Sequence, residues 1–417
     1  MKRKVGVIIR TKNEAKWIRF CLRSLYQQKN IDELSIIIVD CESTDYTVQK
    51  VKSVNNKLKV ITYTGEYFPG KAINLGAREL KDVNYLVILS AHCVPLGKDW
   101  LSKLIIPFEQ NKKIAASYCC QIPTPATSPE NRRDLLNTFS IESRTQTKDS
   151  FFHNAASIIK FSIWEKFQFD ESLKHIEDRY WAKMILEKGY QIFYNAECSV
   201  VHEHGLNQHS LDYKSFRGEG VASLLLDTNL NSNWIDFALK ETDVLIIVIA
   251  AKMPKKSDLI KLKENNEKFT VLVLPKKNSK IKKYNEFLMK RDQFWADISL
   301  YELIKQVLIY KLSKNQFYDY VYFLDGDKIS KNTEGPGNYI LQSYVSGADM
   351  CVKIKSYKED FFMLEPHEVN WKPLSNSLMD TYENKPHFKK ALYGQGVLLR
   401  CDDILQSKMP KVVFFDE

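Results

Sequence analysis

Several patterns that assign a protein to a class at once are missing from this sequence of 417 residues. Its eight cysteines form no Cys-x-x-Cys pair and no spacing typical of a zinc site, which predicts free thiols in a reducing cytoplasm. The N-terminus has no apolar signal stretch, and the longest apolar run, Val244–Ala251, is well short of a membrane span. We therefore expect a cytoplasmic protein whose contact with the inner face of the cell membrane, if it occurs, is peripheral.

The basic excess carries no recognition pattern for nucleic acid. Lysine and arginine number 61 against 51 acidic residues, which gives a net charge of +10. Basic runs such as 276–283 are short and contain no interleaved aromatic residues. We interpret the excess as a solvated, lysine-rich surface that also favours a phosphate-rich ligand or an anionic membrane surface, and we exclude nucleic acid as a partner. The sequence indicates no oligomeric state.

The length of the chain predicts two or three domains, and the apolar patterns place them. Short apolar runs alternate with helical periodicity in the first part, which is typical of a doubly wound α/β sheet. The predicted strands are 5–9, 34–39, 58–62 and 85–89, and the predicted helices are 14–28, 47–54 and 72–80. A second α/β pattern has strands at 244–250, 269–274 and 320–324 and a helix at 300–312. We expect an α/β domain at 1–210, a helical connector at 211–242 and a second α/β domain at 243–417.

Polar residues follow the first, second and fourth predicted strands, where ligands of such sheets bind. They are Thr11, Asn13 and Glu14, then Asp40, Glu42, Ser43 and Asp45, and then His92. A nucleoside diphosphate needs hydrogen-bond acceptors for its base and ribose, and the second group supplies carboxylates and a hydroxyl. The alternative is an Asx-type turn in which Ser43 or Asp45 caps the following helix.

Another segment, Gly70–Gly76, opens a predicted helix after the Pro69 turn. Backbone amides at the start of a helix, together with Lys71, suit an anionic diphosphate or a sugar hydroxyl. A helix cap alone does not require the lysine. We therefore interpret this segment as part of the same binding region.

Taken in order, these segments resemble the family 2 glycosyltransferases of the GT-A fold, in particular the bacterial members that make surface polysaccharides. The segments that carry the resemblance are 5–14, 37–45, 70–76, 89–92 and 176–179. The resemblance covers residues 1–210 and implies a Rossmann-like domain that uses a nucleotide-sugar donor and a glycan or lipid-linked glycan acceptor. It also implies donor contacts for Asp40, Lys71 and Asn74.

The pair Glu177-Asp178 is the candidate catalytic centre. Inversion at an anomeric carbon needs a carboxylate that takes the proton of the attacking hydroxyl. The resemblance implies that Asp178 is this general base and that Glu177 is an acceptor-site or supporting residue. We also expect Asp178 to be the N-cap of the helix that follows. Upstream, Asn154 lies in a segment that resembles the acceptor-side strand of the family.

The metal site departs from the family pattern. Most relatives end the fourth strand in Asp-x-Asp, which holds a divalent cation, but this chain has Ser90-Ala91-His92. The imidazole of His92 either binds Mn²⁺, which it suits better than Mg²⁺, or hydrogen-bonds a phosphate without metal. His202 and its neighbour His204 lie where similar enzymes place a histidine that completes the site. The need for a metal in the first domain is left open.

The second domain carries the Asp-x-Asp form that the first lacks. Asp325 and Asp327 flank Gly326 after the predicted strand at 320–324, which predicts a cation site, although an Asp-Gly turn is the alternative. Residues 393–400 and the terminal Phe414–Glu417 resemble the stretch that precedes an acid pair, but no such pair follows. We expect a diverged, incomplete GT-A-like domain.

Two other functions compete with this interpretation. The second domain is alternatively a sugar nucleotidyltransferase, but the loops after the first strand of each half lack the glycine-rich character of that class. A non-catalytic glycan-binding domain is the other alternative. It leaves the ordered occurrence of Asp40, Lys71 and Glu177-Asp178 unexplained.

Overall fold

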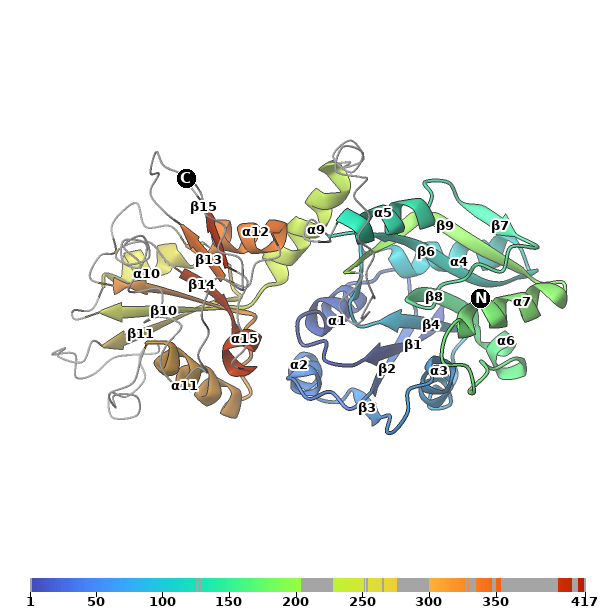
Figure 1. Ribbon diagram of the computed structural model, residues 1–417, viewed down its shortest axis with the longest axis horizontal. Helices are drawn as coiled ribbons and strands as arrows, with labels where there is room; N and C mark the ends of the chain where they lie inside the picture. The colour runs from blue at the N-terminus through green and yellow to red at the C-terminus, as the bar shows by residue number, and fades with distance from the viewer. Residues whose placement is uncertain are drawn as a thin grey trace. The chain divides into compact units, whose positions relative to one another are not determined.

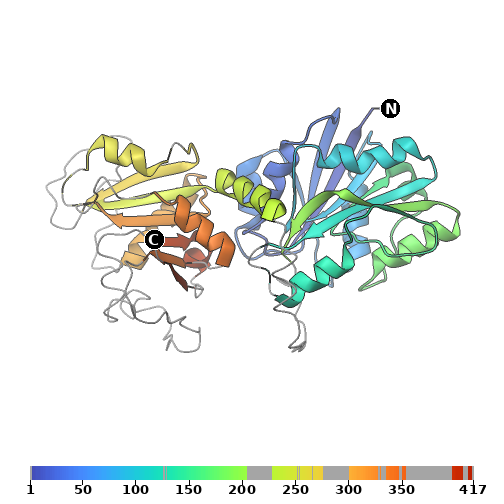
Figure 2. The ribbon, with the colours of Figure 1, turned by 90° about the horizontal axis from the view of Figure 1, so that it is seen from above.

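The chain divides into two compact units, Met1–Trp234 and Ile235–Glu417 (Figures 1 and 2). The computed structural model describes residues 2–203, 228–275, 300–353 and 397–415, except 125, 126, 128, 251, 253, 265, 327, 328, 330–334, 347–349 and 407–411. The predicted connector at 211–242 is described only from residue 228, where helix α9 (Thr228–Glu241) begins. None of the helices in these ranges combines the length and the apolar character needed to span a bilayer.

The first unit is built on one mixed sheet. Its strands are β1 (Lys4–Thr11), β2 (Glu33–Asp40), β3 (Lys59–Thr62), β4 (Tyr85–Ser90), β5 (Cys93–Pro95), β6 (Ile114–Ile122), β7 (Arg144–Gln146), β8 (Ala156–Lys160) and β9 (Gln191–His202). They are ordered β3-β2-β1-β4-β8-β6-β9-β5, and β7 pairs with β9. Strands β3, β2, β1 and β4 are parallel, whereas β8 runs antiparallel to both β4 and β6. The predicted α/β class is therefore confirmed, with a sheet that is parallel on one side and mixed on the other.

Helices cover both faces of this sheet (Figure 1). They are α1 (Ile18–Tyr26), α2 (Thr47–Val54), α3 (Pro69–Ala77), α4 (Trp100–Gln110), α5 (Pro129–Thr138), α6 (Phe161–Lys166) and α7 (Glu177–Glu187). In β1, Val7 and Ile9 pack into a core with α1, α2 and α4, whereas Ile8 packs into a second core with α3, α5, α6 and α7. Alternate residues of a strand point to opposite faces, so the side chains of a continuous apolar run are buried on both faces of the sheet. Each fully buried side chain of this kind contributes about 1.5–3 kcal/mol.

Helix α3 is fixed by two close approaches that only glycine allows. A Cβ on Gly76 would lie 2.8 Å from a methyl carbon of Val39, so the helix packs directly on the sheet. A Cβ on Gly70 would lie 2.3 Å from the carbonyl oxygen of Asp170, in the segment that precedes α7. These contacts hold α3 close to the end of β2 on one side and close to the segment that precedes α7 and the acid pair on the other.

The second unit repeats the strand pattern of the first. Its strands are β10 (Val244–Ala250), β11 (Phe269–Pro275), β12 (Tyr320–Asp325), β13 (Met350–Lys353), β14 (Val397–Arg400) and β15 (Val412–Phe415), and its helices after α9 are α10 (Lys256–Leu262), α11 (Leu300–Ser313), α12 (Gly337–Ser346) and α15 (Cys401–Gln406). The order β11-β10-β12-β14-β13-β15 matches β2-β1-β4-β8-β6-β9. Each pairing also has the same sense, parallel for β10–β11, β10–β12 and β13–β15 and antiparallel around β14. Two sheets of one topology therefore follow each other along the chain.

Candidate active site at the carboxyl end of the first sheet

The loops that follow β1 and β2 are joined into one hydrogen-bonded unit. The carboxylate of Asp40, at the end of β2, accepts hydrogen bonds from the backbone N–H (3.0 Å) and the hydroxyl (2.6 Å) of Ser43. The backbone N–H of Asn13 donates to Ser43 Oγ over 2.8 Å, and Asn13 Oδ1 accepts from the Thr44 N–H over 2.8 Å. Asn13 and Glu42 both have a φ of 55°, which turns the two loops sharply. The predicted donor residues of these loops therefore form one rim.

Other predicted donor residues in this rim differ in how far their polar atoms are engaged. Asp45 accepts from the backbone N–H groups of Ala15 (3.1 Å) and Thr47 (2.9 Å), so its carboxylate fixes the start of α2 as in the alternative Asx turn. Glu42 is exposed at the turn. The hydroxyl of Thr11 is buried and has no hydrogen-bond partner within the described part of the chain. An orphan hydroxyl at the end of a central strand is a candidate ligand contact.

The two predicted residues of α3 have different surroundings. Lys71 is exposed, and its ammonium lies 5.9 Å from the ring centroid of Tyr63. Asn74 is fully buried, and its amide donates to the carbonyl of Phe169 (2.8 Å) and to the carboxylate of Glu171 (3.0 Å). Its carbonyl accepts from Trp164 Nε1 over 3.0 Å. These bonds fasten α3 to the segment before α7. The donor contact expected of Asn74 stays a prediction.

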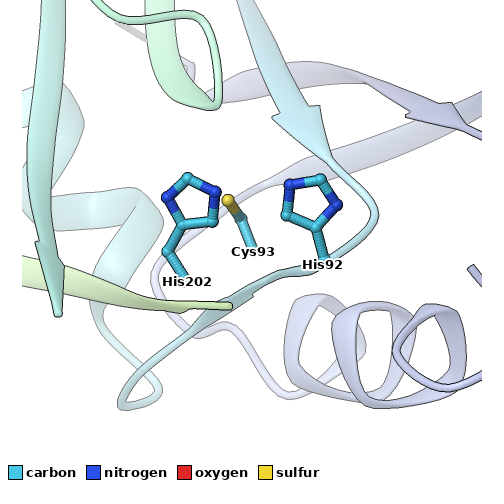
Figure 3. Close-up of side chains that lie close together, drawn as sticks. All are labelled: His92, Cys93 and His202. Carbon is cyan, nitrogen blue, oxygen red and sulfur yellow. The ribbon is translucent and has the colours of Figure 1, made fainter. Parts of the chain in front are cut away.

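Two of the predicted histidines lie together in the first unit. The rings of His92 and His202 are stacked, with centroids 5.1 Å apart and an interplanar angle of 12°. Figure 3 shows the sulfur of Cys93 between them, and each of the three residues offers one ligand atom within 4.8 Å of the others. Sequence analysis did not single out Cys93, because a cysteine that follows a buried strand looks like any core residue. His204, the third predicted histidine, lies outside the described residues.

The partners of these rings decide whether the group fits a metal ion. Nδ1 of His92 lies 2.6 Å from Glu14 Oε1, and Nδ1 of His202 lies 2.6 Å from Gln121 Oε1. A metal-binding histidine characteristically donates its other ring N–H to a carboxylate or carbonyl oxygen. Burial raises the pKa of the Cys93 thiol well above its ordinary value, so without a cation beside it the sulfur is a neutral thiol. The two imidazoles fit a divalent cation, and Glu14 is a supporting residue.

The acid pair lies at the start of α7, preceded by a left-handed residue. The N-cap of this helix is Ile176, with a φ of 58°, and Asp178 belongs to the first turn, so the predicted N-cap function of Asp178 is wrong. The carboxylate of Asp178 instead accepts from the backbone N–H groups of Arg179 (2.8 Å) and Asn154 (3.2 Å). Because the Asn154 N–H belongs to the segment before β8, this bond links the helix to the sheet. Asp178 is half-buried, whereas Glu177 is buried.

The side chain of Asn154 holds the acid pair. It is 1% exposed, its Nδ2 donates to Glu177 Oε1 over 3.3 Å, and its Oδ1 accepts from the Ser157 hydroxyl over 3.1 Å. The side chain of Asn154 thus supports Glu177 and its backbone N–H supports Asp178, whereas the acceptor contact predicted for Asn154 stays a prediction.

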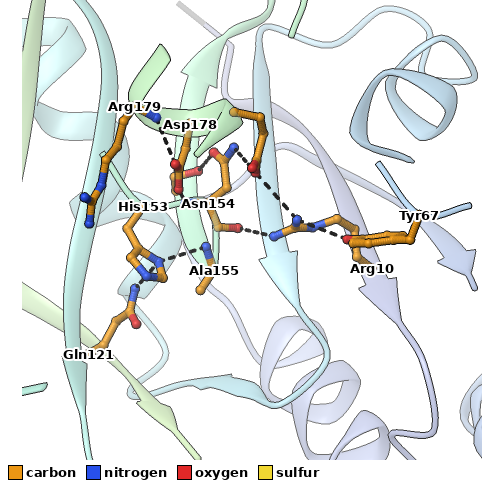
Figure 4. A network of polar contacts seen from close by, with 10 residues as sticks. Arg10, Tyr67, Gln121, His153, Asn154, Ala155, Asp178 and Arg179 are labelled. Atoms are coloured by element: carbon orange, nitrogen blue, oxygen red, sulfur yellow. Dashed lines mark hydrogen bonds and ion pairs between the residues drawn. The ribbon is translucent and has the colours of Figure 1, made fainter. Parts of the chain in front are cut away.

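Arg10 completes this network and was not singled out by sequence analysis (Figure 4). Its guanidinium donates to the carbonyl of Asn154 over 2.9 Å, and its Nη1 lies 3.5 Å from the Tyr67 hydroxyl and 3.9 Å from Glu177 Oε1. The signal available in the sequence was a cation at the carboxyl end of a central strand. Its partners, far along the chain, gave no local pattern.

Residues 6–167 of the first unit match the family model described as "Glycosyl transferase family 2". These residues form a family 2 glycosyltransferase domain. The family and the fold class predicted from the sequence are thus confirmed.

The curated relatives of this domain are distant. The "O-antigen chain rhamnosyltransferase WbaN" of Salmonella anatum is 24% identical over 189 residues, which are 43% of this chain and 59% of the relative. The "O-antigen chain rhamnosyltransferase RfbN" of Salmonella typhimurium is 22% identical over 211 residues, 48% of this chain and 67% of the relative. The chain therefore spans about three fifths of the first relative's length.

Solved structures similar to the glycosyltransferase domain are also distant. A mannosyltransferase, PcManGT, from Pyrobaculum calidifontis in complex with GDP-Man and Mn²⁺ is 20% identical, with a TM-score of 0.39, and the match covers 50% of this chain and 59% of that chain. TarS from S. aureus is 20% identical, with a TM-score of 0.37, covering 48% of this chain and 60% of that chain.

Transfer by the glycosyltransferase domain is expected to fall as the pH is lowered, with an acid limb above the ordinary aspartate pKa. Burial raises the pKa of Asp178, and this effect exceeds the opposing one of the Asn154 and Arg179 N–H groups and of the Arg10 charge. If Asp178 is the general base that the sequence predicts, it acts only when ionised, so the rate constant decreases as the pH falls through this raised pKa. The measurement is kcat/KM for the acceptor as a function of pH, with the donor and Mn²⁺ concentrations held constant. An acid limb at or below the ordinary aspartate value would contradict it.

The second unit places Asp325 at the position that Ser90 has in the glycosyltransferase domain. Val244 pairs with Tyr320 as Val5 pairs with Tyr85, so the two central strand pairs have the same register. In the sequence, residue 327 follows Asp325 by two positions, as His92 follows Ser90. Asp327 and residues 393–396 lie outside the described residues, so the predicted cation site stays a prediction.

Proposed function

We propose that the first unit transfers a sugar from a nucleotide-sugar donor to a hydroxyl of a growing bacterial surface glycan, such as a capsule or lipopolysaccharide chain. The observation that carries the proposal is the half-buried carboxylate of Asp178, anchored by two backbone N–H groups at the same edge of the sheet as Asp40. The family match and the two O-antigen rhamnosyltransferase relatives support it.

The donor is bound, in this proposal, by the rim of the loops after β1 and β2 and by Lys71. The Asp40 carboxylate and the adjacent Ser43 hydroxyl meet the needs of a nucleoside for acceptors. Thr11 offers the orphan hydroxyl and Glu42 an exposed carboxylate. The exposed ammonium of Lys71, the third residue of α3, suits the diphosphate.

The transfer itself is proposed to be a direct displacement that inverts the anomeric carbon. Asp178 accepts the proton of the acceptor hydroxyl as that oxygen attacks. Glu177, held by Asn154 and next to Arg10, fixes the start of α7 and so the direction of the Asp178 carboxylate. Because the base is fixed before substrate binds, little reorganisation is needed at the moment of reaction.

A divalent cation, Mn²⁺ in preference to Mg²⁺, is proposed to be held by His92 and His202. When bound there, it would neutralise charge on the leaving diphosphate. Glu14 and Gln121 accept hydrogen bonds from the two rings and orient them.

The second unit is proposed to be a GT-A-like domain as well. Its sheet has the order and pairing senses of the first sheet, and Asp325 ends the strand that corresponds to β4. We place the divalent-cation site of this unit at Asp325 and Asp327. The protein as a whole is proposed to act in the cytoplasm, where its net charge of +10 favours peripheral contact with an anionic inner membrane face.

The test is a panel of nucleotide sugars, measured by protection of the full chain against thermal unfolding and by donor hydrolysis, with and without Mn²⁺. One donor is expected to raise the unfolding temperature, and Mn²⁺ to increase that shift. The variant His202→Ala is expected to lose the Mn²⁺-dependent part and to lower transfer by at least the factor of about 10–100 that loss of an outer-shell partner of a metal ligand costs.

A matched control is the exposed His175→Ala, which removes an imidazole of the same unit outside this site. The proposal fails if no nucleotide sugar protects the protein. Its metal part fails if His202→Ala and His175→Ala respond to Mn²⁺ alike.

A further inference from the structure

The amide of Gln121 lies between two histidines. Gln121 belongs to β6 and is 1% exposed. Its Oε1 is 2.6 Å from His202 Nδ1, and its Nε2 is 3.1 Å from His153 Nδ1. An amide has one accepting and one donating end, so its orientation decides which ring nitrogen carries a hydrogen.

A backbone group fixes this orientation. The N–H of Ala155 donates to His153 Nδ1 over 3.3 Å, so that nitrogen is an acceptor and the ring is neutral (Figure 4). Gln121 must then turn its NH₂ toward His153 and its carbonyl toward His202. The carbonyl only accepts, so Nδ1 of His202 carries the hydrogen and Nε2 carries the lone pair.

His92 reaches the same tautomer from the other side. Its Nδ1 lies 2.6 Å from Glu14 Oε1, and an ionised carboxylate only accepts, so this Nδ1 also carries a hydrogen. In their neutral form the two stacked rings of the site therefore both present Nε2 as their basic nitrogen, whereas His153 has the opposite tautomer. The tautomer of His202 is thus determined by a chain of three hydrogen bonds, between the Ala155 N–H and His153, between His153 and Gln121, and between Gln121 and His202.

We propose that Gln121 is a positioning residue that sets the tautomer of His202 and so makes the pair His92–His202 competent to bind a divalent cation. The proposal rests on the proposed function, because it assumes that these rings are the metal ligands. The same short segment, 153–155, supplies both the acceptor on His153 and the Asn154 N–H that holds Asp178. Gln121 thus joins the segment that holds the general base to the leaving-group side of the site.

Two substitutions separate the two ends of the amide. Gln121→Leu removes both, so His202 loses its fixed tautomer. Gln121→Glu keeps an acceptor for His202 Nδ1 but loses the donor to His153. Gln146→Leu is the matched control, because Gln146 is 3% exposed and its amide is bonded to Tyr118, Asp149 and Phe151 without contact to a histidine.

The experiment is a long-range ¹H–¹⁵N correlation spectrum of the full chain with ¹⁵N-labelled histidine, followed by titration with Mn²⁺ alone in a calorimeter. The wild type, Gln121→Glu and Gln146→Leu are expected to show His202 with the hydrogen on Nδ1, and Gln121→Leu to lose that pattern. Affinity for Mn²⁺ is expected to fall about 10–100-fold in Gln121→Leu and to stay within a few-fold of wild type in Gln121→Glu.

A wild-type His202 with its hydrogen on Nε2, or a Gln121→Leu variant with wild-type tautomer and Mn²⁺ affinity, overturns the inference. A wild type that does not bind Mn²⁺ overturns its metal part. Absence of sugar transfer in a protein that has the expected tautomer and binds Mn²⁺ overturns the proposed function instead.

Discussion

The variant Asp178→Asn is expected to lose sugar transfer by a factor of about 10²–10⁴ while its affinity for the nucleotide-sugar donor is kept, because a general base contributes this much to the rate. The amide has nearly the volume of the carboxylate, and its oxygen still accepts from one of the two backbone N–H groups that hold Asp178. It has no basic oxygen for the acceptor proton. The measurements are initial transfer rates and protection against thermal unfolding by the donor that the panel identifies.

The control for this variant is Glu187→Gln, at the far end of the same helix. Glu187 is 66% exposed and, among the described residues, forms an ion pair with Lys183 across one turn, so removal of its charge leaves the site intact. Turnover of Asp178→Asn at the level of this control would exclude Asp178 as the base. Loss of donor protection along with turnover would show a binding defect instead.

The variant Arg10→Met is expected to lower the free energy of unfolding by about 3–5 kcal/mol, the usual cost of breaking a buried ion pair by removing one partner. The side chains of Arg10 and Glu177 are 13% and 8% exposed, with 3.9 Å between Nη1 and Oε1. Without the guanidinium, the Glu177 carboxylate stays in a poorly solvated position. The measurement is unfolding by urea, followed by fluorescence and circular dichroism.

Two further variants define the origin of this loss. In Arg10→Met with Glu177→Met, both charges are gone, so most of the lost stability is expected to return. Lys59→Met removes one partner of an exposed pair, with Lys59 and Glu79 52% and 42% exposed, and is expected to change stability by less than about 1 kcal/mol. A double variant no more stable than Arg10→Met would show that Arg10 acts through its other contacts.

The parallel half of the first sheet was predictable because each strand is an uninterrupted apolar run. Strand β2 extends the predicted 34–39 by one residue at each end, and helix α2 has the predicted bounds. The helix predicted at 14–28 begins only at Ile18, after a turn in which the N–H groups of Trp17 and Ile18 donate to the Glu14 carbonyl. The N–H groups of Glu14 and Ala15 are bound by Thr47 and Asp45 of the next loop. Such long-range capture of a backbone donor leaves no local pattern in the sequence.

The sequence placed the candidate site through residues that follow strands, and it gave no sign of the contacts that buried residues make. Asp40 and His92 follow β2 and β4 directly, so topology alone brings them to one edge. Asparagine is a residue type that often contacts ligands, but the side-chain amide of Asn74 forms hydrogen bonds with groups 90 or more residues away in the sequence, such as the indole of Trp164. Gln121 and Arg10 escaped notice for the same reason, because their partners are distant in sequence.

The anchoring of Asp178 has a consequence for how the gene for this chain can drift. One of its two hydrogen bonds comes from the main chain of Arg179, whose side chain is exposed. Every residue type except proline carries that N–H. Codon 179 can therefore change to one for any residue except proline without loss of this hydrogen bond. The placement of the Asp178 carboxylate thus depends on the backbone fold and not on which side chain follows it.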